Sequence, residues 1–175
     1  MIIAVVSLTV MVATSTSLIH ASQTKYKAKL VGVSVVPPVN TTATGRAVIF
    51  VDNDWLWWKL NVTGISDPTM AHIHLGKKGV NGPIVADLLK SAEFENTTER
   101  MIIIGNISNL DLQGPLKGKN FTDIESAIKA HKTIGLHIDL HTNNYPDGEL
   151  RGPVKIQNGS AITKVVGKTN NPITS

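Results

Sequence analysis

Apolar and polar residues alternate with a period of two along most of the chain beyond residue 22. Successive side chains of a β-strand point to opposite faces, so this alternation is typical of strands with one buried and one solvated face. The pattern predicts strands over residues 25–30, 46–51, 55–63, 69–75, 84–89, 100–107 and 133–142, with residues 149–156 paired to the last of these. We therefore expect a mainly β fold, an antiparallel β-sandwich or Greek-key barrel with one short helix.

Two of these segments have a distinctive outward face. In residues 25–30 the outward side chains are three lysines, which suits an edge strand because charge discourages pairing with another sheet. In residues 55–63, Trp55 and Trp57 lie opposite the face expected in the core. They form either a half-exposed patch for a protein, a carbohydrate or a second copy of the chain, or an aromatic pair covered by a loop. The expected core face consists of Leu56, Trp58, Leu60 and Val62.

The helix is expected directly after residue 121. Thr122-Asp123-Ile124-Glu125 has the form of a capping box, whose first and last side chains bond each other's backbone N–H groups. Phe121, Ile124 and Ile128 provide an apolar stripe. His131 falls at the expected C-terminal end, where a cation is favoured, so we interpret it as structural.

The first 21 residues resemble a secretory signal peptide. Residues 2–13 are uncharged and mainly apolar, and the small Ala21 provides a cleavage point. The apolar run is shorter than the ~20 residues that a membrane span needs, so cleavage is favoured over a retained anchor. The expected organisation is a signal peptide over residues 1–21, a β domain over 22–157 and a polar tail over 158–175.

Six Asn-x-Ser/Thr sequons follow the expected cleavage point, more than chance would place in a chain of this composition. Together with the leader they predict a glycoprotein that is secreted or displayed at the cell surface. An Asn- and Thr-rich composition is the alternative explanation. The sequon asparagines are Asn40, Asn61, Asn96, Asn106, Asn120 and Asn158.

Composition narrows the chemistry further. The 175 residues contain no cysteine, which excludes disulfides, thiolate metal sites and cysteine nucleophiles. An apolar fraction of 42% is enough for a packed core. The formal net charge is +4, but the basic residues are spread along the chain without a block, so the sequence does not predict nucleic-acid binding.

Two groups of histidines have the spacing of a strand face. His72 and His74 alternate with aliphatic residues, and so do His137, Asp139 and His141. If the two strands are neighbours, cross-strand Cβ distances of about 5 Å would bring four imidazoles and a carboxylate together. Such a nitrogen-rich set suits copper(II), zinc or nickel, with copper or zinc the expected cofactor. The alternative is structural hydrogen bonding of these side chains to loops and to Asp139.

Four ordered motifs are shared with a known family. They are Val36-Pro37-Pro38-Val39 with Thr44-Gly45, Ala71-His72-Ile73-His74, Gly79 to Val85, and His141-Thr142 with Pro146 to Gly152. Through them the chain, from about Tyr26 to Ile156, resembles the CHRD domain, which is repeated in chordin and found singly in many secreted microbial proteins. The resemblance implies an exported β-sandwich that acts by binding, without a general catalytic activity.

The chain departs from the family pattern before His141. Where the family usually has Tyr-Val-Asn-Val, this chain has His137-Ile138-Asp139-Leu140, which adds an imidazole and an acid to the same face. His72-Ile73-His74 is also similar to the His-x-His strand of copper–zinc superoxide dismutases, an analogy at the level of the fold. Glu149 and Arg151 share one face of the last strand, where they either form a structural ion pair or reach the histidines.

Two functions are consistent with these features. The first is a secreted or cell-surface CHRD-like binding or structural module, without catalysis and with a His-rich metal site. The second is an extracellular copper- or zinc-binding protein that handles metal or acts like a superoxide dismutase. A hydrolase is not indicated, because the sequence contains no nucleophile-elbow motif.

Overall fold

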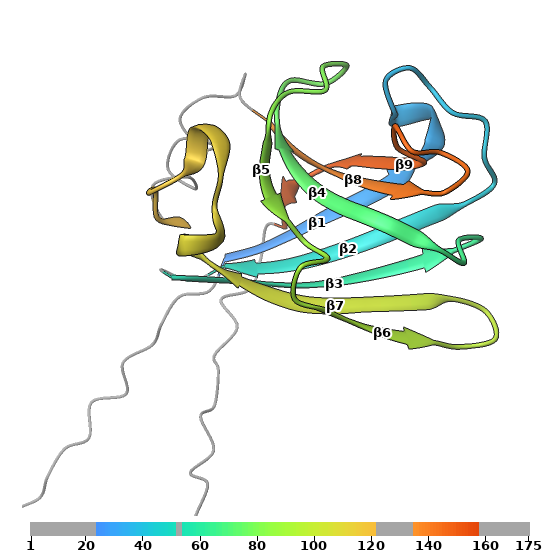
Figure 1. Cartoon of the computed structure of the whole chain (residues 1–175), viewed down its shortest axis with the longest axis horizontal. Helices are drawn as coiled ribbons and strands as arrows, with labels where there is room; N and C mark the ends of the chain where they lie inside the picture. The colour runs from blue at the N-terminus through green and yellow to red at the C-terminus, as the bar shows by residue number, and fades with distance from the viewer. Residues whose placement is uncertain (1–23, 52–53, 122–134, 158–175) are drawn as a thin grey trace, which may run out of the picture.

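The strands form one antiparallel sheet, which curls into an open half-barrel (Figure 1). The computed structural model describes residues 24–51, 54–121 and 135–157. Within these residues, short 3-10 turns occur at η1 (Gly32–Ser34), η2 (Asn109–Asp111) and η3 (Gly114–Leu116). The strands are β1 (Thr24–Val31), β2 (Thr44–Val51), β3 (Trp55–Thr63), β4 (Pro68–Leu75), β5 (Ile84–Asp87), β6 (Ala92–Asn96), β7 (Met101–Ser108), β8 (Leu136–Thr142), β9 (Leu150–Pro153) and β10 (Lys155–Ile156).

Hydrogen bonding continues from one end of this sheet to the other. The strand order is β5-β4-β8-β9-β1-β2-β3-β7-β6, and β10 also pairs with β1. The sheet has two halves, β5-β4-β8-β9 and β1-β2-β3-β7-β6. The halves are connected by the pairing of β9 with β1, where Val31 lies opposite Arg151. The predicted mainly β, antiparallel character is confirmed. The two-layer sandwich or Greek-key detail is not, because the alternation specifies a buried face for each strand and does not show which strands share a sheet.

The inner face of the curl carries the core. In β3 the side chains of Leu56, Trp58, Leu60 and Val62 are buried, as the alternation predicts. Trp58 lies opposite Gly105 of β7, and a Cβ on Gly105 would overlap the indole ring. The glycine therefore provides the space that the largest core side chain needs.

Two strands differ from the expectations. β1 is not an edge strand, since it pairs with β2 on one side and with β9 and β10 on the other. Its alternating lysines show that one face of the strand is solvated. A strand in the interior of a sheet can have such a face just as an edge strand can. β6 has no counterpart among the predicted strands, because four of its five residues are exposed and it lies at the end of the ladder.

Several expectations fall outside the described residues. They are the signal peptide over residues 1–21, the helix after residue 121 with His131, and the tail over residues 158–175. Among the residues that are described, no helix has the length and apolar character needed to cross a membrane.

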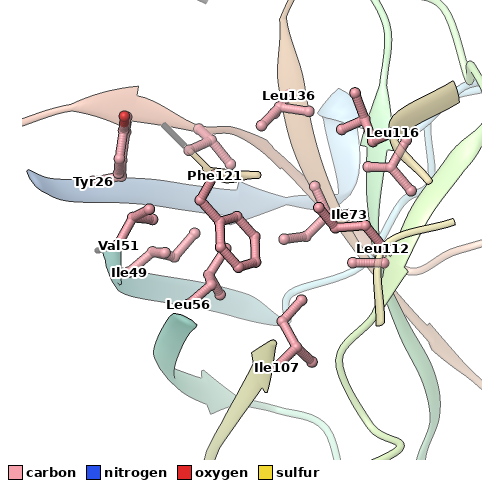
Figure 2. A pocket seen from close by; sticks show the side chains of 13 residues that line it. Tyr26, Ile49, Val51, Leu56, Ile73, Ile107, Leu112, Leu116, Phe121 and Leu136 are labelled. Atoms are coloured by element: carbon pink, nitrogen blue, oxygen red, sulfur yellow. The ribbon is translucent and has the colours of Figure 1, made fainter. Parts of the chain in front are cut away.

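A small apolar hollow, partly open to solvent, lies on the inner side of the sheet (Figure 2). Its lining includes Tyr26 of β1, Ile73 of β4, Leu112 after η2, Phe121 and Leu136 of β8. The surface that it exposes is entirely apolar, so it presents no group that would orient a polar substrate.

Candidate metal centre

β4 and β8 are neighbours, and their register brings the predicted histidines to one place. His72 lies opposite Asp139, His74 opposite His137, and His141 opposite Met70. Paired residues of antiparallel strands point to the same side of the sheet. The expected adjacency of the two histidine strands is therefore confirmed, and the imidazoles share the face opposite Ile73 and the core.

This outer face is nevertheless buried. The exposed fractions of the four histidines lie between 5% and 9%, and that of Asp139 is 1%. Loops provide the cover. The Nδ1 atom of His74 lies 3.2 Å from the carbonyl oxygen of Gly82, and Nδ1 of His141 lies 2.9 Å from that of Pro146. Hydrogen bonds from the histidines to loops were the alternative that the sequence offered, but the loop segments have no periodic pattern that identifies the carbonyls concerned.

The rings form a continuous row across the two strands. Ring centroids are 5.2 Å apart for His72 and His141, 5.8 Å for His72 and His74, and 5.2 Å for His74 and His137. Two sets of three side chains place one ligand atom each within 4.8 Å of the others. The first set is His72, His74 and His141, and the second is His74, His137 and Asp139.

The loop carbonyls fix the protonation pattern of two rings. A carbonyl oxygen only accepts hydrogen bonds, so Nδ1 of His74 and Nδ1 of His141 donate to Gly82 and Pro146. In a neutral imidazole the other nitrogen then carries a lone pair. That nitrogen, Nε2, is buried and has no hydrogen-bond partner in either ring. Nε2 of His137 and Nδ1 of His72 are also buried and unpartnered.

Asp139 is held by an arginine rather than left free. Nε of Arg151 donates to Oδ1 of Asp139 at 2.7 Å, and Nη2 of Arg151 donates to Oδ2. The carboxylate also lies 3.8 Å from Nε2 of His74 and 3.9 Å from Nε2 of His137. Arg151 therefore belongs to this cluster. The sequence signal for it was its place on one face of the closing strand, and the structure sets it in register with Asp139.

Glu149 takes a different role from Arg151. Its carboxylate accepts hydrogen bonds of 2.7 Å from the hydroxyl groups of Thr41 and Thr142. The ion pair of the closing strand is thus Asp139–Arg151, across β8 and β9, and Glu149 joins the segment before β2 to the end of β8.

Electrostatics favours the neutral form of two imidazoles in this cluster, those of His72 and His137. Burial is the main cause that lowers the pKa of His72 and of His137 below the usual value, and the neighbouring His141 and Arg151 act in the same direction. Neutral imidazole is the form that binds metal ions. The protein therefore holds these two rings in the state that a metal site requires.

The remaining predicted sites lie elsewhere. Trp55 and Trp57 of β3 are stacked with ring centroids 6.4 Å apart, and Trp55 is 44% exposed. They are five strands from β4 along the ladder and do not join the histidines. Of the sequon asparagines, Asn61 is half-buried and Asn158 lies outside the described residues. The exposed ones are Asn40, Asn96, Asn106 and Asn120.

Comparison with protein families agrees with the motifs. The model of the CHRD domain matches residues 26–154, which is 129 of the 175 residues. The chain belongs to the CHRD domain family. The matched span of this CHRD domain contains all of the histidine cluster, Asp139 and Arg151. No curated protein and no solved structure matches the chain.

Proposed function

We propose that this CHRD domain is an extracellular binding module that holds a divalent copper or zinc ion in its buried histidine cluster. The observation that carries the proposal is the set of four buried imidazole nitrogens without hydrogen-bond partners. A buried polar atom without a partner carries a desolvation penalty of about 1–3 kcal/mol, so four together need an explanation. A metal ion would satisfy several of them at once.

The three-histidine set is the better site for the ion. His74 and His141 each direct the lone pair of Nε2 into the cluster and His72 adds a buried nitrogen without a partner, whereas Asp139 in the other set already accepts two hydrogen bonds from Arg151. Three nitrogens around a tetrahedral ion at ~2.1 Å would be about 3.4 Å apart. Because the ligand atoms lie within 4.8 Å of one another, the set needs a contraction of at most about 1.4 Å, which we expect side-chain rotation to supply.

The loop carbonyls support the same assignment. Metal-binding histidines usually donate the proton of their second nitrogen to a backbone carbonyl or carboxylate, which fixes the ring and increases its basicity. His74 and His141 make such bonds to Gly82 and Pro146. The hydrogen bonds to loops and the metal site, which the sequence offered as alternatives, are thus compatible in one geometry.

The proposal does not extend to catalysis. A catalytic metal keeps a coordination position open to substrate, whereas these histidines are at most 9% exposed. A structural or storage role for the ion fits such burial. Export of the module is supported by the leader-like segment and by the four exposed sequon asparagines, which a glycosylating enzyme can reach.

Calorimetric titration of the metal-free protein with Cu²⁺ and with Zn²⁺ tests the metal site. We expect one ion per chain, and loss of binding in the His72→Ala/His141→Ala variant. The matched control is Thr69→Ala/Asn143→Ala, which changes two exposed residues at the same strand ends and should bind like the original. Absence of binding, or equal binding by both variants, would contradict the proposal.

A further inference from the structure

The outer face of β1, β2 and β3 gathers cations that are far apart in the sequence. In β1 the residues at even positions, such as Tyr26 and Ala28, are buried, so the lysines at odd positions point outward. The pairing of β1 with β2 and β10, and of β2 with β3, adds three more (Figure 1). We call this group the basic face. It consists of Lys25, Lys27, Lys29, Arg46, Lys59 and Lys155.

The register places like charges directly opposite each other. Lys29 pairs with Arg46, and Lys27 pairs with Lys155. Like charges in such positions destabilise a sheet. None of the six makes an ion pair with another described residue. Glu93 and Glu95 point to the same side of the sheet, in the cross-strand rows of Lys59 and Arg46, but they lie on β6, beyond β7. The strands that carry the basic face, β1, β2, β3 and β10, contain no acid of their own.

An aromatic surface adjoins the cations. Lys25, Phe50 and Trp57 form one cross-strand row, and Nζ of Lys25 lies 5.5 Å from the centre of the Phe50 ring. Trp57 in turn stacks with Trp55, which is 44% exposed. The sequence showed neither the clustering nor this contact, since both depend on strand register.

We propose that the basic face and the adjoining Trp55–Trp57 pair bind an acidic polysaccharide. The cations are spaced by about 4.8 Å between strands and about 6.7 Å along a strand, which makes a flat array and not a pocket. Such an array suits a linear polymer that repeats carboxylate or sulfate groups, and the tryptophan rings offer an apolar surface to the sugar rings. Attraction at this face is electrostatic and is therefore weakened by salt.

Heparin, which is sulfated, and alginate, which carries carboxylates, are suitable probes, with dextran as the neutral control. The protein is first made without glycosylation, because a glycan on Asn61 or Asn106 would lie on the same face. The glycosylated protein is then compared with it, and a glycan at either position should weaken binding. At 0.15 M salt we expect binding to at least one acidic probe and none to dextran. Lys29→Gln/Arg46→Gln/Lys59→Gln should weaken binding about tenfold and reduce its salt dependence.

A charge-matched variant distinguishes binding at the basic face from attraction of the polymer to any positively charged protein. Lys78→Gln/Lys117→Gln/Lys119→Gln removes the same number of exposed cations elsewhere and should change affinity less than about twofold. Absence of binding to both acidic probes, or an equal loss in the two variants, would overturn the proposal. So would tighter binding to single-stranded DNA or to phosphatidylserine vesicles. Metal binding by the histidines is measured separately, so either proposal can fail alone.

Discussion

At the residue scale, the histidine cluster is defined by which atoms have partners. Two imidazoles use one nitrogen for a loop carbonyl and turn the other toward the cluster, where it has none. Asp139 accepts hydrogen bonds from Arg151 of β9. The cluster thus combines imidazole nitrogens without partners with a buried ion pair, and we expect the two parts to respond differently to substitution.

The Asp139–Arg151 ion pair is expected to contribute strongly to the stability of the metal-free protein. Arg151→Gln leaves a buried carboxylate without its cation, so it should lower the free energy of unfolding by about 3 kcal/mol. The pair Lys90–Asp111 offers the matched comparison, since the Lys90 side chain is 69% exposed. Lys90→Gln should cost less than about 1 kcal/mol. Equal effects in urea unfolding would show that burial of the first pair has no energetic consequence.

At the element scale, the alternation of apolar and polar residues predicted which side of a strand is buried better than it predicted which strands lie next to each other. It identified the buried side of β3 and the shared face of each histidine group, because these depend only on the pleat. It assigned β1 wrongly to an edge, because a row of lysines looks the same on an edge strand and on an interior strand. It missed β6, whose exposed residues carry no apolar alternation.

The same reasoning explains what was missed at the metal centre. The sequence named the pairing of the two histidine strands as the condition for a site, and the register of β4 with β8 meets that condition. The burial of the cluster comes instead from Gly82 and Pro146, which lie in loops. No periodicity in a sequence specifies where a loop carbonyl lies, so the hydrogen bonds that orient the rings required the structure.

The contact of Trp58 with Gly105 is expected to limit what β7 tolerates. Gly105→Ala places a Cβ in the space of the indole ring, so it should lower the free energy of unfolding by about 1–3 kcal/mol. Replacing the ring by a smaller one should relieve the clash, so Trp58→Leu should cost less in the Gly105→Ala background than alone. Thermal unfolding of the four proteins measures this coupling. Simple additivity would contradict the steric explanation.

At the scale of the whole molecule, one continuous sheet carries two kinds of chemistry on its outer face. The half with β4 and β8 holds buried imidazoles, while the half with β1 to β3 holds outward-facing cations. The joint between the halves is the pairing of Val31 with Arg151, the residue that binds Asp139. The two proposals therefore concern separate parts of the sheet, a buried metal site and an exposed polysaccharide surface, and each can be tested without the other.

Metal binding is expected to order the covering loops more than the rest of the molecule. An ion on Nε2 of His74 and His141 strengthens the Nδ1–H bonds to Gly82 and Pro146, so both loops should open less often. Hydrogen exchange at short labelling times, which reports local opening, should therefore slow in residues 76–83 and 143–148 when Zn²⁺ is added. The turn closed by Thr97 and Arg100, at the far end of the ladder, is the internal control and should be unchanged. Equal slowing in that turn, or none in the two loops, would show that the ion does not act through these rings.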